Sequence, residues 1–153
     1  MSAAPPSSFL TLAALMFATG IGIPIFAAFN SALGQQLHGA VAANAVAFAI
    51  GLLVSLAILA VIGFPPAGVF TFERPWIWTG AVLVLFYGVS ITYAAPKIGI
   101  GNAIFFVLLG QLVAAAAIDH FGLFGAVKTT ITAQRAIGLL VMAVGVYLAK
   151  KPV

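Results

Sequence analysis

The chain has 153 residues, of which 64% are hydrophobic, only 5% are charged and none is cysteine. A soluble domain is roughly half apolar and about a quarter charged, so this composition excludes that class and predicts an all-α integral membrane protein. The net charge of +4 does not indicate nucleic-acid binding, because the basic residues flank apolar segments, where they anchor helices near lipid headgroups. Without cysteine there is no disulfide, thiol nucleophile or thiolate metal site.

Five apolar segments are long enough to cross a bilayer, since about 20 helical residues span a hydrocarbon core of about 30 Å. Residues 1–8 are expected to form a short disordered tail. A single five-helix transmembrane domain follows over residues 9–153, with spans at 9–29, 40–64, 76–95, 98–118 and 131–149. The fifth segment crosses only if Thr132 and Gln134 are included and Arg135 extends its side chain back to the headgroups.

A proline and several small residues mark special positions within these spans. Gly20, Gly22 and Pro24 are expected to interrupt the first helix, because proline cannot donate a hydrogen bond to the carbonyl four residues earlier. Such a break either lines a transport cavity or is a packing kink. Small residues at four-residue intervals predict close helix packing in the second and fourth spans. They are Gly39, Ala43, Ala47, Gly51 and Ser55, followed by Gly110 and Ala114.

The six basic residues divide evenly between the two membrane faces if all five segments cross. They are Arg74, Lys128 and Arg135 on the face that holds the N-terminus, and Lys97, Lys150 and Lys151 on the opposite face. An asymmetry of Lys and Arg normally sets orientation, so this balance favours dual insertion over one fixed orientation. Five spans place the two termini on opposite faces. Two oppositely oriented copies would therefore form a ten-helix unit with inverted symmetry, of which this chain is half.

No ionisable residue lies well inside a span, so polar residues are the candidates for a solute path. Gln111 lies eight residues before Asp119, about 12 Å below that membrane face, and either contacts substrate or forms an interhelical hydrogen bond. Asn102 is nine residues away and falls on the opposite face of the same helix. The remaining candidates for a substrate-binding lining are Asn30, Asn44, Tyr87 and Tyr93, each individually more typical of a structural role.

Asp119 and His120 end the fourth span and are candidates for coupling or gating, since a carboxylate and an imidazole can exchange protons near neutral pH. A helix C-terminus carries partial negative charge, so Asp119 requires compensation by Lys128, Arg135 or His120. The alternative is an interfacial ion pair that fixes the following loop. The sequence has no Ser/His/Asp constellation, no carboxylate pair and no metal-ligand cluster, so we expect no enzyme, no metal and no cofactor.

The stretches Gly110–Leu112 and Ile118–Gly125 resemble the signature of the YdcZ family, small inner-membrane proteins of the drug/metabolite transporter superfamily. The resemblance extends over all five spans, through Asn30 to Gly34, Phe48, Gly51, Trp78, Gly80, Arg135 and Gly138. It implies a multi-pass exporter of the bacterial inner membrane that pairs with a second copy of itself or with a five-span homologue. Phe26 and Ala47 stand where the family often has Gln and Ser, so the resemblance does not carry a substrate over to this chain.

These observations predict a transporter that moves a small organic solute by alternating access as an antiparallel dimer. Gln111 and Asn30 would line the path, while Asp119 and His120, with Arg135, would gate it or couple it to protons. A small dual-topology ion channel is one alternative, and a membrane subunit that requires a different partner chain is another. The expected partners are the lipid bilayer, a second five-span chain and a small-molecule substrate, with no nucleic acid.

Overall fold

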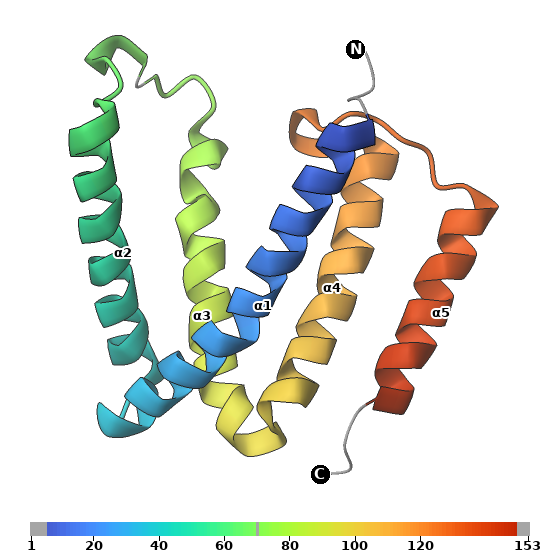
Figure 1. The fold of residues 1–153 in the computed structure, drawn as a ribbon, viewed down its shortest axis with the longest axis horizontal. Helices are drawn as coiled ribbons and strands as arrows, with labels where there is room; N and C mark the ends of the chain where they lie inside the picture. The colour runs from blue at the N-terminus through green and yellow to red at the C-terminus, as the bar shows by residue number, and fades with distance from the viewer. Residues whose placement is uncertain (1–5, 70, 150–153) are drawn as a thin grey trace. The chain divides into compact units, whose positions relative to one another are not determined.

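The computed structural model describes residues 6–69 and 71–149, which form five α-helices and three short 3-10 helices (Figure 1). No strand occurs within these two ranges, so the all-α prediction is confirmed. The chain divides into two compact units, Met1–Pro96 and Lys97–Val153. The first unit holds α1, α2 and nearly all of α3, and the second holds α4 and α5.

The first unit begins with a helical hairpin formed by α1 (Pro6–Gln36) and α2 (Ala40–Ile62) (Figure 1). A three-residue turn joins them, in which the Gly39 N–H donates to the Gly34 carbonyl at 2.9 Å and His38 adopts a positive φ of 52°. Such a short connection makes the two helices antiparallel neighbours. The hairpin therefore places the C-terminal end of α1 beside the N-terminal end of α2.

The third helix of this unit starts with a 3-10 turn. After η1 (Ala67–Val69), η2 (Pro75–Thr79) leads directly into α3 (Gly80–Ile98). Proline suits the first position of a helix, because that residue needs no N–H donor and its φ is already helical. Together η2 and α3 form one apolar stretch of 24 residues, which is long enough to cross a membrane.

The second unit consists of α4 (Ile100–Phe121), η3 (Leu123–Gly125) and α5 (Ala133–Ala149), with α4 and α5 side by side and antiparallel (Figure 1). Gly122 ends α4 in the left-handed conformation, at φ +63°, and its N–H donates to the Ile118 carbonyl. At the start of α5, the Thr132 hydroxyl accepts a hydrogen bond from the Arg135 N–H at 3.2 Å, which caps the helix.

Four of the helices match the expected spans in length and hydropathy: Phe9–Gln36, Ala40–Ile62, Pro75–Ile98 and Ile100–Phe121. The fifth, α5, has 17 residues and is about 25 Å long, at the short end of the range that crosses a bilayer. It begins at Ala133 rather than at Ile131, because Thr132 serves as the cap. A crossing by α5 stays a prediction.

Two expectations about α1 are wrong. The helix starts at Pro6, so the expected tail is already helical over its last three residues, while residues 1–5 lie outside the described ranges. The helix also continues through Gly20, Gly22 and Pro24 without interruption. Proline removes only one backbone hydrogen bond, and in hydrocarbon no water is present to satisfy the other backbone groups if the helix opens.

The predicted ridge of small residues on α2 packs only near its start. Ala43 is fully buried, whereas Gly51 and Ser55 are exposed and a side chain at Gly51 would meet nothing within 4 Å. The Ser55 hydroxyl instead donates to the Gly51 carbonyl at 2.8 Å. On α4, Gly110 and Ala114 are likewise exposed. These positions stay candidates for contact with a helix of another chain.

Candidate functional site

The buried core of the first unit is polar and made of small residues. Asn44 is the largest fully buried side chain in the part of the chain that the structure describes. On α1 and α3 the buried residues recur every three or four positions, and on α2 they are adjacent, so on each helix they lie on one side. They are Ala27, Asn30 and Ser31 on α1, Ala43 and Asn44 on α2, and Gly88, Ile91, Thr92 and Ala95 on α3.

The hydroxyl of Thr92 joins all three helices of this unit. Asn30 on α1 donates to it through Nδ2 at 2.7 Å, and Asn44 on α2 donates through Nδ2 at 3.2 Å. The hydroxyl itself donates to the Gly88 carbonyl at 2.7 Å, one turn earlier on α3. Polar side chains inside a membrane need such partners, because no water is available to them. We call this arrangement, formed by Asn30, Asn44 and Thr92, the Thr92 junction.

Two glycines allow the helices to approach closely enough for the Thr92 junction to form. A Cβ atom at Gly34 on α1 would lie 2.6 Å from Cγ2 of Thr92, well inside van der Waals contact. A Cβ atom at Gly88 on α3 would overlap Oδ1 of Asn44. Any larger residue at either position would therefore force helices apart or displace a buried amide.

Three buried oxygen atoms in this unit have no hydrogen-bond partner among the described residues: Ser31 Oγ, Asn44 Oδ1 and the Tyr87 hydroxyl. The Tyr87 ring stacks on Phe26 of α1, with centroids 6.4 Å apart. Tyr87 lies eleven residues from the end of α3, about 16 Å along the helix and so near mid-membrane. A buried oxygen without a partner costs about 1–3 kcal/mol, so each of the three calls for a hydrogen-bond donor or acceptor that the described residues do not supply.

The turn between α4 and α5 holds the charged candidates. Arg135 Nη2 lies 2.6 Å from Asp119 Oδ2, and the side chains are 36% and 38% exposed, respectively. The Asp119 carbonyl accepts a hydrogen bond from the Thr129 N–H at 2.8 Å, and Nδ1 of His120 accepts one from the Ile131 N–H at 3.2 Å. The pair thus neutralises Asp119 at the helix C-terminus and ties down the following loop.

Both sites lie within residues 11–148, which match the model of a protein family described as "Putative inner membrane exporter, YdcZ". The chain belongs to this family. Together with the long apolar helices, the match places the chain in the inner membrane as a multi-pass protein. It also assigns the chain to a group of exporters rather than of enzymes. No curated protein and no solved structure matches the chain.

In this YdcZ-family chain, the residues predicted separately to line a solute path are partly brought together. Asn30 and Asn44 converge on Thr92, which the sequence analysis missed, and Tyr87 lies on the same helix as Thr92. The four-residue spacing of Gly88 and Thr92, typical of close helix contacts, is the signal that points to Thr92. Tyr93 is 62% exposed and lies outside this core.

Gln111 belongs to the other unit, outside the three helices that form the Thr92 junction. It is exposed on α4, on the face opposite Leu109, Leu112 and Val113, which line a cavity against α5. Asn102 is 93% buried and donates to the Ile98 carbonyl at 2.9 Å, so the two amide residues of α4 occupy different surroundings, as expected from their spacing. A substrate contact for Gln111 stays a prediction, as do gating roles for Asp119, His120 and Arg135.

Proposed function

We propose that this YdcZ-family chain exports a small organic solute by alternating access and binds that solute in the polar core of the first unit. Family membership supports export across the inner membrane. The observation that carries the site is the set of buried oxygens on Ser31, Asn44 and Tyr87 that have no partner among the described residues, in the same unit as the Thr92 junction. A solute with hydrogen-bond donors would supply the partners that these oxygens lack.

The surroundings of these oxygens suggest how the site works. Amide and hydroxyl groups supply the polar contacts, while the stacked rings of Phe26 and Tyr87 supply an apolar wall near mid-membrane. Hydrogen bonds between membrane helices are worth only about 1 kcal/mol each, so the Thr92 junction can open and re-form at low cost. Such exchange between helix–helix and helix–solute hydrogen bonds is what alternating access requires.

The proposal extends to assembly, in which two oppositely oriented copies make the working unit. The even division of basic residues and the odd number of helices support it. Small residues on α2 and α4 also support it, because a Cβ atom at Gly51 or Gly110 would meet no described residue of its own unit within 4 Å, which leaves room for a helix of a second copy. Gln111, next to Gly110 on the exposed part of α4, would then lie at this interface.

The solute site is tested by Tyr87→Phe. The solute is first identified by mass spectrometry, as a compound that accumulates in the medium of cells expressing the chain but not of vector controls. Its uptake into inverted membrane vesicles is then measured. We expect Tyr87→Phe to lower the initial rate about tenfold, the effect of losing one hydrogen bond of about 1.4 kcal/mol to the solute. Thermal stability should hold or rise, because the hydroxyl has no hydrogen-bond partner among the residues that the structure describes.

The matched control is Ser90→Ala, which removes a hydroxyl from the exposed face of the same helix and should leave the uptake rate unchanged. A normal rate in Tyr87→Phe would overturn the assignment of the site. Loss of transport together with loss of stability would show a structural role for Tyr87 instead.

The assembly is tested by orientation. A single cysteine is added at the C-terminus of this cysteine-free chain, and intact cells are treated with a membrane-impermeant maleimide. We expect labelling of about half of the molecules, relative to permeabilised cells, because balanced flanking charges give both orientations. Labelling of nearly all or nearly none would establish one fixed orientation and rule out the antiparallel homodimer.

A further inference from the structure

The contact between α4 and α5 leaves a long apolar groove in the second unit. Three cavities follow one another along it, with volumes of about 310, 250 and 370 Å³. Phe105 lines both the first and the second, while Leu109 and Ala143 line both the second and the third. Not one residue of α5 is buried. The two helices therefore touch without filling the space between them.

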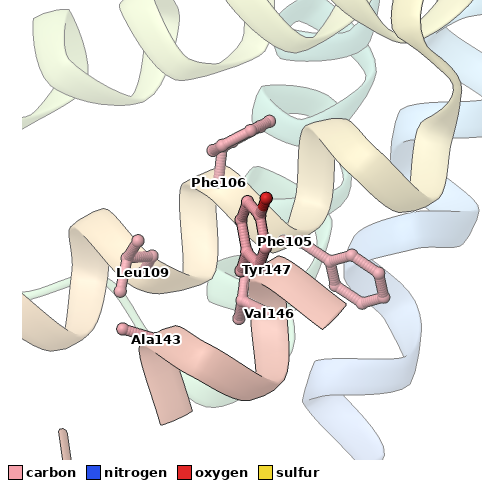
Figure 2. Close-up of a pocket in the computed structure, with 6 residues that line it drawn as sticks. All are labelled: Phe105, Phe106, Leu109, Ala143, Val146 and Tyr147. Carbon is pink, nitrogen blue, oxygen red and sulfur yellow. The ribbon is translucent and has the colours of Figure 1, made fainter. Parts of the chain in front are cut away.

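Figure 2 shows the middle cavity, with side chains contributed by both helices. The residues on α4 are Phe105, Phe106 and Leu109, and those on α5 are Ala143, Val146 and Tyr147. From Ile100 at the start of α4 to Leu109 is nine residues, about 14 Å along the helix. This is close to half of a hydrocarbon core about 30 Å thick. The first two cavities thus extend from one membrane face to the midplane, which is the depth of one lipid leaflet.

The mouth of the groove differs from the rest because it is more polar and because basic residues lie near it in the sequence. Gly99, Gly101 and Asn102 line it, at the N-terminal end of α4, where the helix dipole is positive. Lys97 is exposed two residues before Gly99. In the sequence, two further lysines directly follow Ala149, which lines the mouth from α5. None of the residues lining the three cavities is acidic.

We propose that this groove binds one acyl chain of an anionic phospholipid, with the phosphate at the mouth beside Lys97. The depth of the first two cavities fits one leaflet, the walls of the groove are apolar, and basic residues next to a membrane helix attract anionic headgroups. A helix of a second copy is about 10 Å wide and does not fit a channel made of cavities of this size. The proposal concerns the second unit and is independent of the solute site proposed above.

The test uses the full chain purified in a mild detergent and native mass spectrometry with added phosphatidylglycerol or phosphatidylcholine. We expect phosphatidylglycerol to bind at least tenfold more tightly, and Lys97→Gln to remove most of that preference. Ala143→Phe places a ring where the second and third cavities meet and should abolish the tight binding. Val141→Phe adds the same ring at a position that is 64% exposed on the opposite face of α5 and should leave binding unchanged.

Equal binding of the two lipids by the unaltered chain would overturn the proposal, and so would undiminished binding by Ala143→Phe. Circular dichroism and gel filtration, compared with Val141→Phe, show whether Ala143→Phe folds. If it does not fold, the test rests on Lys97→Gln. An unchanged preference of that variant for phosphatidylglycerol overturns the proposal. Displacement of the lipid by a second copy would appear in the same spectra as a lipid-free dimer, and would likewise overturn it.

Discussion

The two units of this chain hold their helices together in opposite ways. In the first unit, Asn30 and Asn44 reach across to Thr92, and glycines let the backbones approach. In the second unit, large apolar side chains meet between α4 and α5 and leave a groove. Inside a bilayer, apolar side chains gain little by leaving lipid for one another. Close packing there depends on small residues and polar contacts, and helices that lack them leave space for lipid.

Of the substitutions considered, Gly88→Ala in the first unit should therefore have the largest effect on the free energy of unfolding. The added methyl group would overlap Oδ1 of Asn44, which is fully buried and cannot swing aside without losing its Nδ2 hydrogen bonds. We expect a loss of about 1–3 kcal/mol in the free energy of unfolding, as is typical when a packed core is overfilled. Thermal unfolding in detergent, followed by circular dichroism, measures this loss as a lower Tm.

The matched control is Gly51→Ala on α2, where an added methyl group meets nothing within 4 Å. We expect its effect on the free energy of unfolding to stay within about 0.5 kcal/mol, the usual range for open positions. Equal effects of the two substitutions would mean that the first unit does not depend on close approach of its helices. The proposed difference in helix packing between the two units would then be wrong.

The positions of the helices could be predicted from the sequence, whereas the residues of the candidate site could be predicted only in part. Continuous apolar runs leave a backbone in hydrocarbon few choices besides a helix, and Gly63, Gly99 and Gly122 mark the ends of α2, α3 and α4. The break expected at Pro24 rested on the one hydrogen bond that proline removes, but the helix is continuous there. In hydrocarbon, keeping the rest of the helix is worth more than relieving one lost hydrogen bond.

The Thr92 junction was beyond sequence reasoning because its partners are far apart in the chain. Asn30 and Thr92 are separated by 62 residues, and Asn44 and Thr92 by 48. Helical periodicity gives the face on which a residue lies, but not which faces meet. The Asp119–Arg135 pair spans only 16 residues, and the electrostatics of a helix C-terminus already required a positive partner there. The charge at the helix C-terminus therefore predicted Arg135 as one of three possible partners of Asp119.

The Asp119–Arg135 pair should contribute least to the free energy of unfolding, in contrast to the buried hydrogen bonds of the Thr92 junction. We expect a double-mutant cycle with Asp119→Asn and Arg135→Gln to give a coupling below about 1 kcal/mol, because both side chains are more than a third exposed and water screens their attraction. The free energy of unfolding is measured in detergent at low and at high salt, and the coupling should weaken at high salt. A coupling above about 2 kcal/mol that salt does not change would show a desolvated pair and favour a gating role. A weak coupling would mean that α5 is held against α4 mainly by apolar contacts around the groove, because the charges at the turn would then contribute little to the stability of the second unit.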